Sequence, residues 1–218
     1  MAAEIEGDWN GFKIRLVTVE DIEKIQSHLI DNFYRDEPLC NSMGYSEDMG
    51  EDFFQIWKTF VSHNLSLVAL DSETNEIAGV RITLDHHKDF DWSVYNMKSW
   101  QALNILTILG MVEDKANIYE EFNIDRYADW FLVSVDKKYR GRRLAQELYK
   151  RSINLAKEKG LPLVKCIFSS PYSRKAGANL GFQELGSVRG TEAVDENGEK
   201  IFPNVSPDQV VVLGVLTL

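Results

Sequence analysis

The sequence predicts a mixed α/β (α+β) fold for the 218-residue chain, because three observations agree. Stretches with apolar residues every three or four positions alternate with short apolar stretches typical of strands. Hydrophobic residues make up 44% of the chain, enough for a sizeable core, and its two cysteines are too few for a disulfide framework. No repeat or low-complexity linker divides the sequence, so we expect a single domain over residues 1–218.

The first half of the chain contains both periodicities. Strand-like apolar stretches occupy residues 12–17, 65–70 and 77–84. Helical spacing predicts two helices, over residues from about 19 to 32 and from 53 to 61. Pro38 and Gly44 bracket what we expect to be a loop between these helices. The segment between the second and third strands has the composition of a hairpin turn, so these strands are expected to pair.

The second half completes the expected sheet and its helices. Three helices are expected, over residues 99–112, about 141–159 and 173–180. Four strands are expected, over residues 130–135, 163–168, 182–188 and 210–216. The first two of these strands are nearly all apolar, as in strands that are buried on both faces. Aromatic side chains between residues 85 and 122 fit either a pocket wall or ordinary core.

Charge and hydropathy limit the classes of partner. The chain carries 24 Lys and Arg against 34 Asp and Glu, a formal net charge of −10 at pH 7. Phosphate groups repel an acidic surface, which argues against nucleic acid and anionic membranes and favours cationic partners. No apolar run approaches the ~20 residues that span a bilayer. The acidic N-terminus also lacks the apolar core of a signal peptide, so we expect a soluble cytoplasmic protein. We further expect it to act as a monomer.

One short segment departs from this acidic character. Five cationic residues lie between an expected strand and an expected helix, namely Lys137, Lys138, Arg140, Arg142 and Arg143. The first amides of a helix have no partner within the helix and carry partial positive charge, so they favour phosphate groups. A basic turn in this position indicates a polyphosphate ligand, with a solvated basic surface as the alternative.

The same segment carries a family resemblance. Residues 133–145 resemble the acetyl-CoA signature of the GCN5-related N-acetyltransferases, Gln/Arg-x-x-Gly-x-Gly/Ala after a strand. Arg140 and Ala145 fit this pattern, whereas Arg143 stands where the pattern has glycine. Residues 172–182 are similar to the family's second motif, a short helix ending in Leu-Gly-Phe.

Two further segments narrow the resemblance. Residues 33–39 (Phe-Tyr-Arg-Asp-Glu-Pro-Leu) and 166–173 (Cys-Ile-Phe-Ser-Ser-Pro-Tyr-Ser) resemble the insect arylalkylamine, or dopamine-type, N-acetyltransferases. The resemblance covers about residues 12–216 and is weakest from 85 to 123. It implies a mixed central sheet that is splayed at the acetyl-CoA site, with flanking helices.

The resemblance also implies an acetyl-CoA site. The implied contacts are Val133, Ser134, Val135, Arg140, Gly141, Arg142, Arg143, Leu144, Ala145, Ser173 and Lys175. Glycine lets the backbone approach a phosphate closely, whereas Arg143 brings a Cβ and a long side chain. We therefore expect weakened or altered binding there, or an outward side chain that grips a phosphate of CoA.

Acetyl transfer to an amine needs a free lone pair. An alkylamine of pKa ~10 is only ~0.1% neutral at pH 7, which costs ~4 kcal/mol. A carboxylate near the amine recovers part of this cost by taking the proton. The resemblance implies Glu37 as this general base, with neighbouring Asp36 as its rival. It also implies catalytic roles for Ser169 and Ser173, although Ser173 could instead cap a helix.

Other candidate chemistry is weaker. Tyr172 competes with the serines for protonation of the leaving thiolate. Cys166 could form an acetyl-cysteine, but a strand cysteine is more often a small core residue. His86-His87, followed by two aspartates, resembles a metal cluster only loosely, and adjacent strand residues face opposite sides. A surface loop is the better interpretation of this pair, and we expect no metal.

The expected function is acetyl transfer from acetyl-CoA to the primary amine of a small arylalkylamine in a ternary complex. The resemblance implies dopamine, tyramine, octopamine, serotonin or tryptamine as substrates. One alternative is an enzyme for agmatine, a polyamine or another aliphatic amine, or one that uses a longer acyl-CoA. A second is a non-catalytic acyl-CoA-binding protein, suggested by Arg143. A third, acetylation of protein N-termini or lysines, needs an open groove, which the aromatic residues between 85 and 122 argue against.

Overall fold

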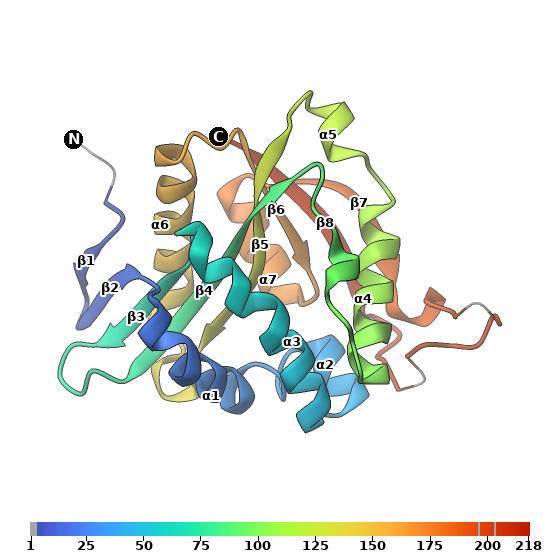
Figure 1. Cartoon of the computed structure of the whole chain (residues 1–218), viewed down its shortest axis with the longest axis horizontal. Coiled ribbons are helices and arrows are strands. Elements are labelled where there is room, and N and C mark those ends of the chain that lie inside the picture. The colour runs from blue at the N-terminus through green and yellow to red at the C-terminus, as the bar shows by residue number, and fades with distance from the viewer. Residues whose placement is uncertain (1–3, 196, 203) are drawn as a thin grey trace.

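A computed structural model describes residues 4–195, 197–202 and 204–218. In these ranges eight strands form one mixed sheet in the order β1-β2-β3-β4-β5-β6-β8-β7 (Figure 1). The strands are β1 Gly7–Trp9, β2 Phe12–Leu16, β3 Leu67–Asp71, β4 Ile77–His87, β5 Arg126–Val135, β6 Leu163–Phe168, β7 Gln183–Arg189 and β8 Val210–Thr217. β5 and β6 run parallel, and the other neighbouring pairs are antiparallel.

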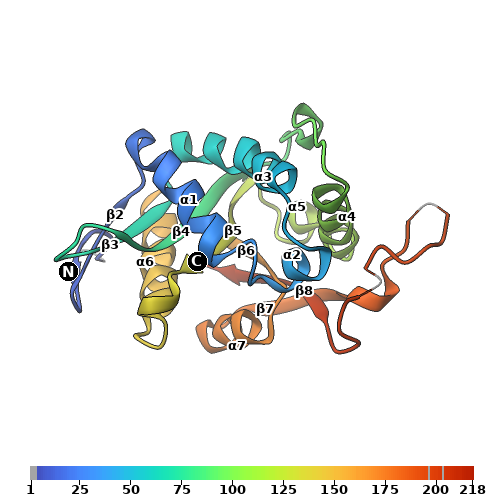
Figure 2. The same cartoon turned by 90° about the horizontal axis from the view of Figure 1, so that it is seen from below.

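Helices cover both faces of the sheet. They are α1 Ile22–Asn32, α2 Pro38–Met43, α3 Glu47–Phe60, α4 Trp100–Glu113, α5 Ile118–Glu121, α6 Leu144–Glu158 and α7 Pro171–Leu180. The view in Figure 2 shows α1 and α3 on one face and α6 and α7 on the other. α4 packs against α3 and against β7 and β8, so the space between α4 and the sheet is bounded on several sides.

β5 contains the irregularity that shapes the centre of the sheet. Its register with β4 shifts, because Ile82 pairs with Leu132 while the next residue of β4 pairs with Trp130, which leaves Phe131 as a bulge. β5 pairs with β6 only from Ala128 to Trp130. Beyond this point the two strands separate. Residues 131–135 therefore have an edge that no other strand of the described ranges occupies.

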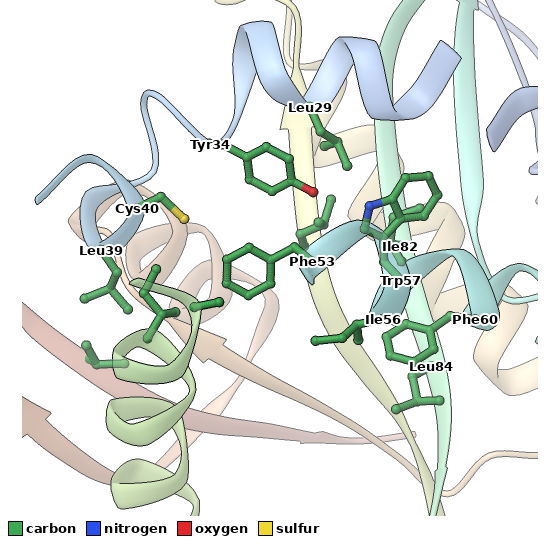
Figure 3. Packing of buried hydrophobic residues seen from close by; sticks show 14 of the residues in the cluster. Leu29, Tyr34, Leu39, Cys40, Phe53, Ile56, Trp57, Phe60, Ile82 and Leu84 are labelled. Carbon is green, nitrogen blue, oxygen red and sulfur yellow. The ribbon is translucent and has the colours of Figure 1, made fainter. Parts of the chain in front are cut away.

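The larger apolar core lies between the sheet and the helices α1, α3 and α4. Figure 3 shows side chains from α1, α2, α3 and β4 that point toward one another, and these are Leu29, Leu39, Cys40, Phe53, Ile56, Trp57, Phe60, Ile82 and Leu84 together with Tyr34. A second core lies under α6, where Leu144 and Leu148 pack with Phe12, Ala78 and Trp130. α1, α3 and α6 thus each bury one apolar stripe, as their periodicity predicts.

Each strand and helix that the sequence predicts is present, but the expected loop between Pro38 and Gly44 is wrong. Residues 38–43 form the short helix α2. Pro38 occupies its first position, where a missing N–H costs nothing, and Glu37 caps it. Gly44 follows with a positive φ of 74° and ends the helix. A proline next to a capping residue was the overlooked signal.

The boundaries of two other elements also differ from expectation. β4 continues to His87, so the histidine pair belongs to a strand and the expected surface loop is wrong. α6 begins at Leu144 instead of about residue 141. The helix starts later than expected because Gly141 and Arg143 have positive φ angles of 79° and 64°. A helix cannot include residues in this conformation.

Close packing of α7 on β6 depends on one glycine. A Cβ at Gly177 would clash with the ring of Phe168, whereas a Cβ at Gly110 in α4 would meet no described atom within 4 Å. We expect Gly177→Ala to lower the free energy of unfolding by about 1–2 kcal/mol, since overpacking outweighs the gain in helix propensity. Gly110→Ala, its matched control, should raise it by about 0.5–1 kcal/mol. Urea unfolding measures both, and stabilisation by Gly177→Ala would contradict the packing.

Candidate active site

A cavity of about 330 Å³ lies between α4, the helices that precede it and the splayed strands. Its walls are mostly apolar and include Phe33, Tyr34, Phe53, Trp92, Tyr95, Met97, Leu106, Leu109, Phe131 and Ile167. Its ionisable and hydroxyl-bearing lining includes Glu37, Glu113, Asp129, Lys165 and Ser169. Two of the expected aromatic residues, Trp92 and Tyr95, thus contribute to a pocket wall. An apolar cavity with a few polar groups is the usual form of a small-molecule site.

Part of the cavity lining follows β6 and the residue after it. Alternate residues of a strand face the same side, and Lys165, Ile167 and Ser169 all line the cavity. Lys165 and Ser169 are four residues apart, which corresponds to roughly 13 Å along a strand. Figure 1 shows α2 beside the N-terminal end of α4, while Glu113 is the last residue of α4. Glu37, which caps α2, and Glu113 therefore lie toward opposite ends of the cavity.

Glu37 lines this cavity, and one of its carboxylate oxygens has no hydrogen-bond partner among the described residues. Its Oε2 accepts a hydrogen bond of 2.8 Å from the backbone N–H of Cys40 and so fixes the side chain at the start of α2. Its Oε1 is buried and has no hydrogen-bond partner among the described residues. A buried acceptor without a partner is energetically costly, so Oε1 is suited to a donor on a ligand.

Asp36, the rival base, occupies a different environment. It is exposed, pairs with Nη2 of Arg140 at 2.9 Å and Nζ of Lys137 at 3.4 Å, and is not among the cavity-lining residues. Slight burial acts to raise the pKa of Asp36, but these two cations outweigh it and lower the pKa. The Asp36 carboxylate is therefore a weaker proton acceptor than an ordinary aspartate, and it is already paired with two cations.

The residues expected near the leaving thiolate divide into two groups. Ser169 lines the cavity, and its carbonyl oxygen accepts a hydrogen bond from Gln209. Ser173 lies in the first turn of α7, where its Oγ donates to the Ser170 carbonyl at 3.0 Å. Ser170 is the N-cap of α7, so Ser173 completes the cap as its third helical residue. Tyr172 is 89% exposed. Neither Tyr172 nor Ser173 is among the described residues that line the cavity.

The strand and helix of the acetyl-CoA motif leave backbone groups available. Val133, Ser134 and Val135 pair with β4, and β6 does not pair with them. The Val135 carbonyl accepts a hydrogen bond from Nε of Arg140 at 3.1 Å. Among the described residues, no side chain caps the N-terminus of α6, which leaves the amides of its first turn available to an anion. Leu144 is buried and Ala145 half-buried, while Lys175 on α7 is exposed.

The five cations of the basic turn point in different directions. Lys137 and Arg140 pair with Asp36, and Lys138 pairs with Glu76. Arg142 donates to the Asn10 carbonyl and stacks on Phe12, with its guanidinium carbon 4.3 Å from the ring centre. Arg143 lines a groove of about 440 Å³ between α6 and α7, together with Trp9, Gln146, Glu147, Tyr149, Lys150, Ala176, Asn179 and Leu180.

Arg143 keeps the backbone conformation for which glycine is suited. Its φ of 64° lies in the left-handed region, where a Cβ is strained. We expect Arg143→Gly to raise the free energy of unfolding by about 0.5–1 kcal/mol. Arg143→Lys, which keeps both Cβ and charge, should change it little. Urea unfolding of both variants measures the difference, and equal stabilities would show that backbone strain at this position is negligible.

The remaining candidates belong to the core. His86 is buried in β4, stacks on Tyr127 with ring centres 4.9 Å apart and hydrogen-bonds to Tyr119, which corrects its assignment to a surface loop. Cys166 is buried, and burial raises the pKa of its thiol to about 11, so it is a poor nucleophile at neutral pH. No group of three or more potential metal ligands occurs in the described part of the chain.

Sequence reasoning missed four residues at or beside the site. Lys165, Asp129 and Glu113 form a charged cluster in the cavity wall. A lone lysine in the otherwise apolar strand 163–168 was the available signal. Nε2 of His28 lies 2.9 Å from Oγ of Ser134 and is buried with it. Helical spacing places His28 on the buried side of α1 but does not identify its partner.

Comparisons with known solved structures agree with this fold. No protein-family model matches the chain. A solved structure, provisionally named arylalkylamine N-acetyltransferase 7 of the yellow fever mosquito Aedes aegypti, is 27% identical with a TM-score of 0.84, and the match covers 94% of this chain and 87% of that one. Arylalkylamine N-acetyltransferase 2 of Aedes aegypti is 24% identical with a TM-score of 0.83, covering 95% and 99%. Polyamine N-acetyltransferase of Drosophila melanogaster is 22% identical with a TM-score of 0.81, covering 95% and 100%.

The chain therefore has the fold of the GCN5-related N-acetyltransferases, which confirms the fold that its motifs predict. Within that fold it is similar to the arylalkylamine N-acetyltransferases of insects, as its sequence indicated. These similarities support an acyltransferase that uses acetyl-CoA. Within the described ranges, no helix has the length and apolar character needed to cross a membrane.

Proposed function

We propose that the protein transfers the acetyl group of acetyl-CoA to the primary amine of a small arylalkylamine. The observation that supports this most directly is that Glu37 lines a cavity with aromatic walls and has one buried carboxylate oxygen, Oε1, without a partner in the described chain. Such a cavity suits a flat ring, and the free oxygen suits the ammonium group attached to it. Dopamine, tyramine, octopamine, serotonin and tryptamine have this combination.

Glu37 acts as the general base in this proposal. Its carboxylate first attracts the ammonium group and then takes its proton, directly or through a water molecule. The free amine attacks the thioester while both substrates are bound. Since the neutral amine costs ~4 kcal/mol at pH 7, a base held at the amine is a large part of the catalysis. Ser169 contributes a hydroxyl in the same cavity.

The chain offers a consistent set of groups for acetyl-CoA. The edge of residues 131–135 that β6 leaves free supports hydrogen bonds to an extended amide chain. The uncapped start of α6 supports diphosphate binding, and Arg143 adds a cation in the groove beside it. Ser173 and the exposed Tyr172 on α7 are the proposed sources of the proton for the leaving thiolate.

One alternative acceptor has a specific observation in its favour. The polyamine N-acetyltransferase of Drosophila melanogaster forms N-acetylagmatine, and a second cation on such a substrate needs a carboxylate. Glu113 and Asp129 supply carboxylates in this cavity. Lys165 pairs with both of them, however, so each carboxylate already has a cationic partner.

Release of CoA thiol from acetyl-CoA tests the proposal directly. The acceptor panel comprises tyramine, dopamine, serotonin, agmatine, spermidine and a lysine peptide. We expect turnover with the arylalkylamines and much less with the others. If folded protein releases no thiol with any acceptor, the proposal is wrong, and a calorimetric titration with CoA then tests the non-catalytic acyl-CoA-binding alternative.

A further inference from the structure

The end of the cavity away from Glu37 contains a charged cluster. Nζ of Lys165 donates to Oδ2 of Asp129 at 2.9 Å and to Oε1 of Glu113. The Lys165 and Asp129 side chains are only 3% and 5% exposed, whereas Glu113 is 37% exposed. All three residues line the cavity. The parallel register pairs Asp129 of β5 with Lys165 of β6, next to the point where the strands separate.

This cluster has unused hydrogen-bonding capacity of both kinds. Burial opposes the charged form of Lys165, but the carboxylates of Asp129 and Glu113 outweigh it and raise its pKa, so the ammonium persists at neutral pH. An ammonium group has three donors, and the two carboxylates take two of them. One donor of Lys165 and one oxygen of Glu113 are left without a partner in the described chain. Two carboxylates and one ammonium also leave one net negative charge.

We infer that Lys165 and Glu113 form a distal subsite that recognises a ring hydroxyl of the amine substrate. This inference rests on the proposed function. A hydroxyl both donates and accepts, so it can donate to Glu113 and accept from Lys165 at once. A second ammonium or a guanidinium has donors only, so it can donate to Glu113 but leaves the free donor of Lys165 without an acceptor. A ring without a hydroxyl leaves both groups of the cluster unpartnered against an apolar surface.

The cluster therefore sets substrate preference without touching the reacting amine. A hydrogen bond to a charged group contributes about 1.5–3 kcal/mol, which corresponds to about 10- to 100-fold in kcat/KM. We therefore expect kcat/KM for tyramine to exceed that for phenethylamine, which lacks only the hydroxyl, by about 10- to 100-fold. The difference in kcat/KM between the two amines should arise mainly from KM, because the ground state and the transition state use the distal contact equally.

Glu113→Gln tests this subsite, and the partial exposure of Glu113 makes the variant tolerable to the fold. We expect it to reduce the ratio of kcat/KM for tyramine and phenethylamine from about 10- to 100-fold toward one. The matched control is Asp114→Asn, an exposed carboxylate one residue further along that does not line the cavity and should keep the ratio. Equal kcat/KM for both amines in the wild type, or an unchanged ratio in Glu113→Gln, would overturn the inference and leave the proposed function intact.

A binding experiment separates this inference from catalysis. Calorimetric titration of wild type and Glu113→Gln with tyramine, phenethylamine and agmatine reports the distal contact even without turnover. Tighter binding of tyramine that Glu113→Gln removes supports the subsite. If the wild type binds tyramine no more tightly than phenethylamine, or binds agmatine best, the hydroxyl subsite is wrong. Absence of thiol release with all three amines, by contrast, refutes the proposed function.

Discussion

Replacing Glu37 with glutamine is expected to lower kcat by about 10²- to 10⁴-fold, the range for loss of a general base. Glutamine has nearly the same shape, and its amide oxygen can still accept the Cys40 N–H that Glu37 now receives at 2.8 Å. The cap of α2 and the walls of the cavity should therefore persist. What is lost is the ability to take a proton from the bound ammonium. Initial rates of thiol release with tyramine measure the effect.

The pH dependence of the same variant distinguishes a base from a structural residue. Without a base, the rate depends on amine that is already neutral, and this fraction rises tenfold per pH unit up to a pKa of ~10. Activity of Glu37→Gln should therefore increase with pH across the range where the wild type levels off. Asp36→Asn should cost less, because the Asp36 carboxylate pairs with Arg140 and Lys137 outside the cavity lining. A larger loss in Asp36→Asn than in Glu37→Gln would make Asp36 the base.

The fold was predictable because its signals are local. Alternation and three- to four-residue spacing are properties of neighbouring residues, and the buried strands 130–135 and 163–168 lie within β5 and β6. The acetyl-CoA motif is also contiguous, so its loop and helix could be placed. Errors arose where short-range rules compete. Pro38 was interpreted as a loop former although it begins α2. The helix predicted from about residue 141 begins at Leu144, because Gly141 and Arg143 have positive φ angles.

The candidate site was predictable only in part, because its lining comes from distant segments. Glu37 and Ser169 came from the family resemblance, and both line the cavity. Glu113 and Lys165 are 52 residues apart in sequence and belong to a helix and a strand. Periodicity indicates which face of each element is buried, but it does not specify which buried faces meet. The charged cluster therefore could not be assembled from the sequence alone.

His28 illustrates the same limit and leads to the second large expected effect. Its imidazole is 106 residues from Ser134 in sequence, yet Nε2 lies 2.9 Å from the serine hydroxyl inside the protein. Burial is the main cause that lowers the pKa of His28 to about 4, and nearby Asp136 and Asp31 only partly oppose it. The folded protein thus holds His28 neutral at pH values where the unfolded chain, with a pKa of ~6.5, is protonated.

Stability should consequently fall as the solution becomes acidic. Between pH 6.5 and 4 the unfolded state binds the additional proton, so the free energy of unfolding decreases with decreasing pH. The contribution of His28 is fully present above about pH 6.5, and about 3 kcal/mol of it should be lost by pH 4. Because other groups also titrate in this window, the informative quantity is the difference between wild type and His28→Gln, measured by urea unfolding at each pH.

His28→Gln removes the titrating ring but keeps an amide near the position of Nε2, so its stability should depend less steeply on pH than that of the wild type. Ser134→Ala provides the matched control, since it removes the hydrogen-bond partner and leaves the imidazole buried. Burial is the dominant cause of the shifted pKa, and Ser134→Ala should therefore keep the steep dependence between pH 6.5 and 4. If Ser134→Ala flattens the profile as much as His28→Gln does, the hydrogen bond, and not burial, holds His28 neutral. Parallel profiles for wild type and His28→Gln would mean that another group is responsible for the acid sensitivity.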